Sequence, residues 1–281
     1  MNFFKNKHNK IYSGIKITLF ITFYFTFQKV ASLLFNPLDF TNYYIVYILI
    51  KSLSVIALII AFILVYKLEK RSPRKFGVIF SKQSLKHLLI GLILGALSIT
   101  IIALLLFATD NATLTYSFDK PIFSSNIIYV LIIFILVGID EELLVRGYIV
   151  HTLNRYNNKY VVYIIPAVIF SALHFLNPNV SIVGLINIVL IGILFTYMTL
   201  KTKNILMAIG YHITWNFFQG GFFGFNVSGS TLWDSVYPIR IIHDNLLTGG
   251  DFGLEGGILT TLIFVIVTMI VYLIPIENNQ Y

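Results

Sequence analysis

Apolar residues gather in long runs along the whole chain, and short polar segments separate one run from the next. About 20 apolar residues in an α-helix are enough to cross the hydrocarbon core of a bilayer, which is roughly 30 Å thick. The pattern therefore predicts an all-α fold, a polytopic membrane helix bundle with about eight transmembrane helices. The expected spans are 11–35, 43–66, 87–109, 124–145, 160–176, 181–200, 204–223 and 256–275.

The composition agrees with a membrane protein and narrows the chemistry. Of 281 residues, 57% are hydrophobic and only 11% are charged, whereas soluble domains have about 25% charged residues. The chain contains no cysteine, which excludes disulfides, thiolate metal sites and cysteine nucleophiles.

The net charge of +8 follows membrane topology and does not indicate nucleic-acid binding. With the N-terminus in the cytosol, sixteen of the twenty basic residues fall in cytosolic segments. Only Lys120 and Arg240 fall in segments on the external side of the membrane, while Lys29 and Lys51 lie within spans. This bias is what the positive-inside rule describes. We expect an integral, multi-pass protein with both termini in the cytosol and the long loop 224–255 outside.

Three consecutive carboxylates, Asp140, Glu141 and Glu142, end the fourth apolar run. Ionisable residues at membrane depth are costly, and they mark functional sites by default. Glu142 and Arg146 are four residues apart, so that they share a helix face and can form an ion pair. Glu141 points about 100° away, which leaves it as a candidate general base for activating water. We expect Asp140 to be a solvated neighbour without a role.

Two later spans each contain one histidine. The hairpin that turns near residues 157–158 places His174 at the depth of Glu141. His212 and Asn216 share a helix face, where an imidazole and an amide could stabilise an oxyanion. Either histidine alone could equally well hydrogen-bond a neighbouring helix, and Phe170 is expected to serve packing.

The three motifs Glu141-Glu142-x-x-x-Arg146, Phe170-x-x-x-His174 and His212-x-x-x-Asn216 resemble the signatures of the CPBP family. These are intramembrane proteases related to the CAAX prenyl endopeptidases, also called the Abi family. The resemblance covers roughly residues 90–275. It divides the chain into residues 1–86, with two spans and a basic cytosolic loop, and a protease core at 87–281. Residues 248–256 are similar to a block near the C-terminus of some bacterial members, and we assign them no role.

The resemblance implies an intramembrane endopeptidase. Glu141 would activate water with help from His174, while His212 and Asn216 would bind the oxyanion. The supporting residues would be Glu142, Arg146 and Phe170. The family has also been described as metalloproteases, with Glu141, His174 and His212 as ligands. Such a set suits Zn²⁺ with one open position, and spacing leaves the metal-bound and the metal-independent mechanisms both open.

The implied substrate is a membrane-embedded or lipid-anchored peptide. The composition, rich in Ile, Lys, Asn and Phe, resembles that of an AT-rich bacterium, so we expect a bacterial cell membrane. Peptide maturation of the bacteriocin-processing type, self-immunity and envelope functions all stay open. Two alternatives are a non-catalytic bacteriocin-immunity or binding protein on the same scaffold, and an ion-coupled transporter using carboxylates as proton relays. The sequence lacks the paired broken helices that would favour the transporter.

Overall fold

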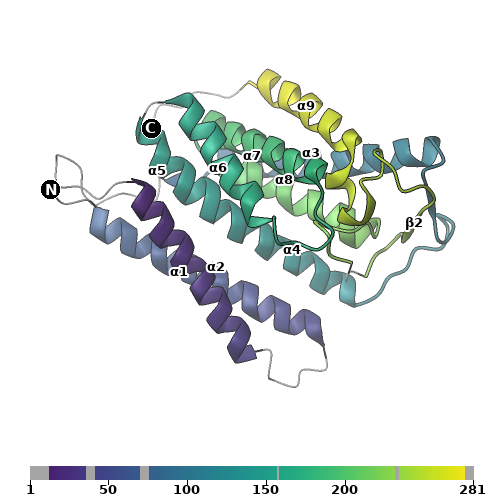
Figure 1. The fold of residues 1–281 in the computed structure, drawn as a ribbon, viewed down its shortest axis with the longest axis horizontal. Coiled ribbons are helices and arrows are strands. Elements are labelled where there is room, and N and C mark those ends of the chain that lie inside the picture. Colours follow the sequence, from purple (N-terminus) through teal and green to yellow (C-terminus); the bar gives the residue numbers. More distant parts are fainter. Residues whose placement is uncertain (1–12, 36–41, 70–75, 157, 232–233, 276–281) are drawn as a thin grey trace.

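The protein is a bundle of α-helices in the computed structural model, which describes residues 13–35, 42–69, 76–156, 158–231 and 234–275 (Figure 1). Each expected span that lies in these ranges contains a helix, so the all-α prediction is confirmed. The helices are α1 (Ser13–Phe35), α2 (Tyr43–Glu69), α3 (Lys82–Ala108), α4 (Asn126–Glu142), α6 (Lys159–Leu173), α7 (Ile182–Thr202), α8 (Leu206–Asn216) and α9 (Ile258–Leu273).

Four of the described helices, α1, α2, α3 and α7, are long and apolar enough to cross a membrane by themselves. Helices α6 and α9 are apolar but shorter. We conclude that the chain is an integral membrane protein, while the number of eight crossings stays a prediction. Both termini and the basic residues Lys5, Lys7, Lys10, Lys70, Arg71, Arg74 and Lys75, on which the predicted orientation partly rests, lie outside the described residues.

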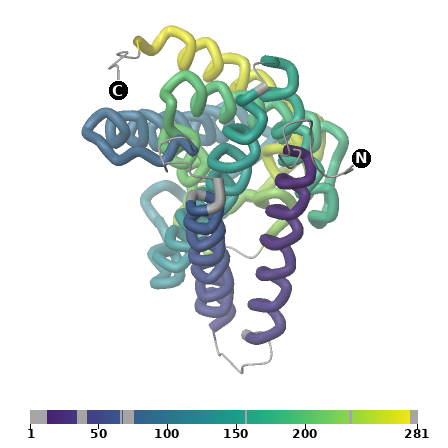
Figure 2. The backbone as a smooth tube through the Cα atoms, turned by 90° about the vertical axis from the view of Figure 1, so that its left-hand side faces the viewer, coloured from purple at the N-terminus to yellow at the C-terminus, as the bar shows by residue number. Residues whose placement is uncertain are grey.

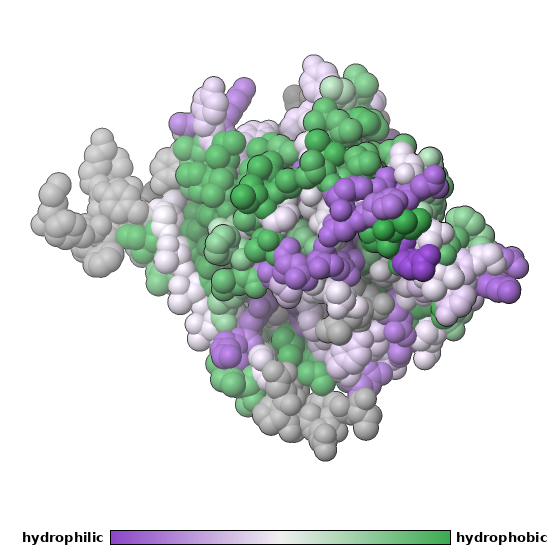
Figure 3. All heavy atoms as spheres, turned by 45° about the vertical axis from the view of Figure 1, so that its right-hand side comes forward, coloured by the Kyte–Doolittle hydropathy of each residue, from purple (hydrophilic) through white to green (hydrophobic). Residues whose placement is uncertain are grey.

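The surface of the bundle fits contact with lipid. On α3, large apolar side chains are exposed at about every fourth position, so they form one stripe. Figure 3 shows hydrophobic side chains over broad areas of the surface, with hydrophilic ones gathered in patches. The residues of the stripe on α3 are Leu85, Leu89, Ile93, Leu97, Ile101 and Leu104.

Two helices continue as π-helical turns at the positions where the polar motifs stand. After α4, a π-helical segment runs over Leu143–Val150 and leads into the short helix α5 (His151–Leu153). After α8, a second π-helical segment runs over Phe217–Phe222. Each segment starts at the residue after a motif residue, Glu142 in α4 and Asn216 in α8. Such wide turns are rare and frequently occur at functional sites.

Helix α8 lies in the centre of the bundle, where it contacts α3, α4 and α7. Glycines allow α3 to approach it closely, because a Cβ atom on Gly91 would lie 2.1 Å from the Met207 carbonyl oxygen. A Cβ atom on Gly95 would lie 2.3 Å from Thr214 Oγ1. The Thr214 hydroxyl also donates to the Leu92 carbonyl at 2.8 Å. Small residues of this kind let membrane helices pack backbone to backbone.

Helices α1 and α2 form a pair at one side of the bundle, as Figure 2 shows in purple and blue. They contact each other, and α2 also contacts α4. The division into residues 1–86 and 87–281 stays a prediction, although polar contacts described below join the two parts.

The long loop after α8 folds back onto the bundle. Its strand β2 (Ile239–Ile241) pairs antiparallel with β1 (Ala112–Leu114), which follows α3. Two 3-10 turns, Gly250–Phe252 and Leu254–Gly256, precede α9. Between them Gly253 has φ +99°, and a Cβ atom there would lie 2.0 Å from the Asn226 carbonyl oxygen. Only glycine fits this close approach.

Candidate active site

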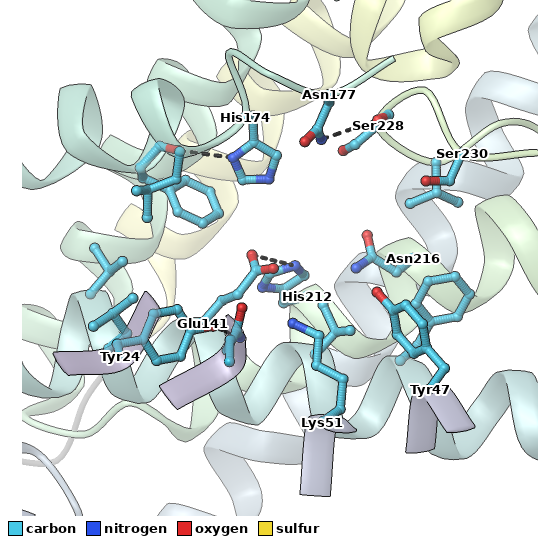
Figure 4. Close-up of a pocket in the computed structure, with 18 of the residues that line it drawn as sticks. Tyr24, Tyr47, Lys51, Glu141, His174, Asn177, His212, Asn216, Ser228 and Ser230 are labelled. Atoms are coloured by element: carbon cyan, nitrogen blue, oxygen red, sulfur yellow. Dashed lines mark hydrogen bonds and ion pairs between the residues drawn. The ribbon is translucent and has the colours of Figure 1, made fainter. Parts of the chain in front are cut away.

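One pocket of about 310 Å³ brings together the four residues predicted to be catalytic. Glu141 comes from α4, His174 follows α6 directly, and His212 and Asn216 come from α8. Figure 4 shows these side chains around the pocket. Phe170 also lines it. Residues from three parts of the chain therefore converge as the common depth predicted.

The ion pair expected from the four-residue spacing is present and completely buried. Arg146 Nη1 lies 2.8 Å from Glu142 Oε1, and both side chains are 0% exposed. Arg146 Nη2 donates to the Gly192 carbonyl at 3.2 Å. The guanidinium lies 4.5 Å from the ring centre of Phe170 and 5.0 Å from that of Phe195. Phe170 thus packs on the cation, which supports the packing role given to it.

Glu142 has a second partner that the spacing did not predict. Its Oε1 atom lies 3.0 Å from His212 Nδ1. An ionised carboxylate only accepts hydrogen bonds, so this ring nitrogen donates. His212 Nε2 lies 3.9 Å from Glu141 Oε2. The ring therefore lies between the two glutamates, and its Nε2 atom can donate to a ligand only when the imidazole carries both protons.

His174 is also oriented by one defined contact. Its Nδ1 atom lies 2.8 Å from the Phe170 carbonyl oxygen. A carbonyl oxygen accepts, so Nδ1 carries the proton and Nε2 of the neutral ring is left as an acceptor. The predicted span continued to residue 176, but α6 ends at Leu173 and His174 is its C-cap residue. That position directs the ring into the pocket.

Glu141 differs from the other two carboxylates of its helix. Its side chain is 23% exposed, and its Oε2 atom is buried without a hydrogen-bond partner among the described residues. Its lone pairs are therefore not occupied by a hydrogen-bond donor of the described residues. The residues that the structure describes include no group of three His, Asp or Glu side chains placed to hold one metal ion. The Zn²⁺ set of Glu141, His174 and His212 stays a prediction, and so does the metal-independent mechanism.

The expectation for Asp140 is wrong, because its side chain is fully buried. Its carboxylate accepts hydrogen bonds from Tyr24 at 2.6 Å and Ser54 at 2.8 Å, and forms an ion pair with Lys51 at 3.2 Å. Gln28 donates to it at 3.3 Å. Asp140 therefore joins α4 to α1 and α2. The lysine within an apolar run was the signal that could have revealed this cluster.

The same cluster supplies one wall of the pocket. Tyr24, Gln28 and Lys51 line it from α1 and α2. The opposite wall comes from loops, where Asn177 Nδ2 donates to the Ser228 carbonyl at 3.1 Å. No role for these residues was predictable from the sequence, because their positions depend on tertiary packing.

Comparison with known proteins identifies part of this arrangement. Residues 123–218 match the family model described as type II CAAX prenyl endopeptidase Rce1-like. The matched segment contains all three motifs, and it agrees with the resemblance seen in the sequence. It supports peptidase activity in a membrane protein. No curated protein and no solved structure matches the chain.

Proposed function

Given the match of residues 123–218 to the Rce1-like family model, we propose that this chain is an intramembrane endopeptidase. It hydrolyses a peptide bond with a water molecule that Glu141 activates. The observation that carries the proposal is the pocket, where Glu141, which has no Lys or Arg partner in an ion pair among the described residues, faces two oriented imidazoles and an amide. The proposed substrate is a membrane-embedded or lipid-anchored peptide. The proposed biological process is the processing of bacteriocin-type peptides.

In the first step Glu141 takes one proton from the water molecule as its oxygen bonds to the scissile carbonyl carbon. His174 accepts a hydrogen bond from the same water through Nε2, because its Nδ1 atom donates to Phe170. General-base catalysis of this kind contributes about 10²- to 10⁴-fold in rate.

In the second step the negative charge on the carbonyl oxygen is stabilised by hydrogen-bond donors. The Asn216 amide is always a donor. His212 can join it when the ring carries both protons, because Glu142 accepts from Nδ1 and the Nε2–H group then faces the oxyanion. The carbon–nitrogen bond then breaks, and Glu141 returns its proton to the departing amine. This balances the reaction as water plus peptide to acid plus amine.

Our first test is mass-spectrometric detection of cleaved membrane peptides. Cells producing the wild type are compared with cells producing Glu141→Gln at matched protein levels. Fragments that occur only with the wild type are expected, and they identify the substrate. Full biological activity of both Glu141→Gln and His174→Ala would contradict the proposal and favour a non-catalytic immunity or binding protein.

A chelator tests the metal alternative separately. Because the proposed steps use only side chains of the chain itself, we expect cleavage of the identified peptide to persist after exhaustive treatment with EDTA. Loss of activity that Zn²⁺ restores would overturn this mechanism and leave the peptidase assignment intact.

A further inference from the structure

Glu255 is a buried carboxylate that the proposed mechanism does not use. It belongs to the 3-10 turn before α9, in the block 248–256, and is 6% exposed. Its carboxylate accepts hydrogen bonds from Gln219 Nε2 and from Ser228 Oγ, the latter at 3.2 Å. No ion pair of the described residues includes Glu255.

The backbone of Glu255 is held as firmly as its side chain. Asn187, 0% exposed on α7, donates to the carbonyl oxygens of Glu255 at 2.7 Å and Gly257 at 2.9 Å. Thr261 donates to Asn187 Oδ1 in turn at 2.6 Å. The position of the carboxylate is therefore fixed from α7 and α9 as well as from the loop.

Glu255 lines a second, smaller cavity behind the catalytic residues, with a volume of about 40 Å³. His174, His212 and Asn216 line the same cavity. These three residues and Ser228 also line the large pocket, so the two spaces have a common wall. The small cavity thus lies between the catalytic side chains and Glu255.

This cavity has the properties of a water site. A buried water needs about 10–15 Å³ of accessible volume and two to four polar partners. The small cavity exceeds that volume, and its polar lining consists of His174, Asn187, His212, Asn216, Ser228 and Glu255. Its other walls are apolar, formed by residues such as Trp215 and Phe264.

Gln219, which donates a hydrogen bond to Glu255, has an acceptor atom that no described residue uses. It is 0% exposed, and its Oε1 atom has no hydrogen-bond partner among the described residues. Its amide nitrogen donates both to Glu255 and to the Asn226 carbonyl. Burial also raises the pKa of the Glu255 carboxyl, which favours the neutral acid. A neutral acid can donate as well as accept hydrogen bonds.

We propose that the small cavity binds water next to the active site, and that Glu255 is the positioning residue that holds this water for delivery to Glu141 and His174. The delivery role rests on the proposed peptidase function, whereas water binding does not. A protease within a bilayer needs a nearby supply of water, because water is a reactant in hydrolysis and is scarce in the surrounding hydrocarbon. Glu255 acts through the water and does not touch the scissile bond.

The first experiment measures the water directly, on the full-length protein in detergent micelles. X-ray radiolysis turns bound water into hydroxyl radicals that oxidise adjacent side chains, and mass spectrometry locates the products. Phe264 lines the cavity and is 3% exposed, while Phe76 is 1% exposed and lines neither space. We expect faster oxidation of Phe264 than of Phe76, and loss of the difference in Glu255→Leu. Equal rates in the wild type would overturn the proposal.

The second experiment measures the kinetics of the peptide found by proteomics. Glu255→Leu should lower kcat about tenfold with KM unchanged, and Glu255→Gln, which keeps hydrogen-bonding groups, should lose clearly less. Thr248→Val is the matched control, since it also removes a buried polar group from this loop, and Thr248 lines neither the pocket nor the small cavity. Equal losses in the Gln and Leu variants, or a loss confined to KM, would overturn the positioning role. If the wild type cleaves nothing, the proposed function fails, while the radiolysis result still decides whether Glu255 holds water.

Discussion

Replacing Arg146 by methionine tests the centre of the site most sharply. Arg146 is 0% exposed and neutralises Glu142 at 2.8 Å. In Arg146→Met the carboxylate would stay buried without its cation, although His212 Nδ1 would still donate to it. Methionine has a similar length and keeps most of the apolar contact with Phe170.

The expected loss in the free energy of unfolding is large. Breaking a buried ion pair by removing one partner costs about 3–5 kcal/mol. Loss of the cation–π contacts with Phe170 and Phe195, at 4.5 and 5.0 Å, adds about 0.5–2 kcal/mol. The sum is a large part of the roughly 5–15 kcal/mol that stabilises a typical folded protein.

The assay is reversible unfolding in mixed micelles, with the free energy taken from the denaturation curve. Lys86→Met serves as the control, because Lys86 is an exposed cation on α3 and such changes stay within about 0.5 kcal/mol. The double variant Glu142→Gln/Arg146→Met removes both charges and should be more stable than Arg146→Met alone.

Two results would refute this reasoning. One is an Arg146→Met variant as stable as the Lys86→Met control. The other is a double variant whose loss in unfolding free energy equals the sum of the losses in Glu142→Gln and Arg146→Met, since that would mean that the two residues are not coupled. Exchanging the two residues is a weaker test, because it would place an arginine beside His212 Nδ1, where Glu142 now accepts a hydrogen bond.

Three further predictions concern other parts of the structure. Asn216→Leu should lower kcat about 10²- to 10³-fold with a small change in KM, because it removes the proposed oxyanion donor; an unchanged kcat in steady-state assays would contradict this. Gly95→Val should abolish the folded fraction in size-exclusion chromatography, since its Cβ atom would lie 2.3 Å from Thr214 Oγ1, whereas Gly14→Val, with nothing within 4 Å, should not. Because burial raises the Glu255 pKa, the folded state resists ionisation, so stability should fall as pH rises above the ordinary value of about 4.3. Glu255→Gln should flatten this part of the pH profile of unfolding, and an identical profile would argue against it.

Much of the site was predictable because helical periodicity converts spacing into geometry. The interval from Glu142 to Arg146 predicted their ion pair, and equal distances from a hairpin turn predicted that Glu141 and His174 would lie at the same depth. These inferences need only the rise and the turn of an α-helix. The boundary before His174 was less predictable, because helix ends depend on local hydrogen bonds as well as on the apolar pattern.

The contacts that spacing could not predict join segments far apart in the chain. His212 meets Glu142 across 70 residues, and Asp140 meets Tyr24 across 116. Glu255 was harder still, because it follows a loop whose path is set by glycines and backbone contacts and carries no periodic signal. Single residues of this kind acquire a role only after the helices have packed.

The ion pair between Lys51 and Asp140 has a consequence for how the protein is made. The two residues are 89 positions apart, so α2 enters the membrane well before α4 has been synthesised. A lysine at the centre of a membrane helix costs about 2.5–3.5 kcal/mol on insertion scales, and the strongly apolar remainder of α2 has to offset that cost alone. Arrival of α4 supplies the aspartate that neutralises the lysine. We therefore expect an order in biogenesis, in which α1 and α2 reach their final packing only after α4, the helix that carries Glu141, has joined them.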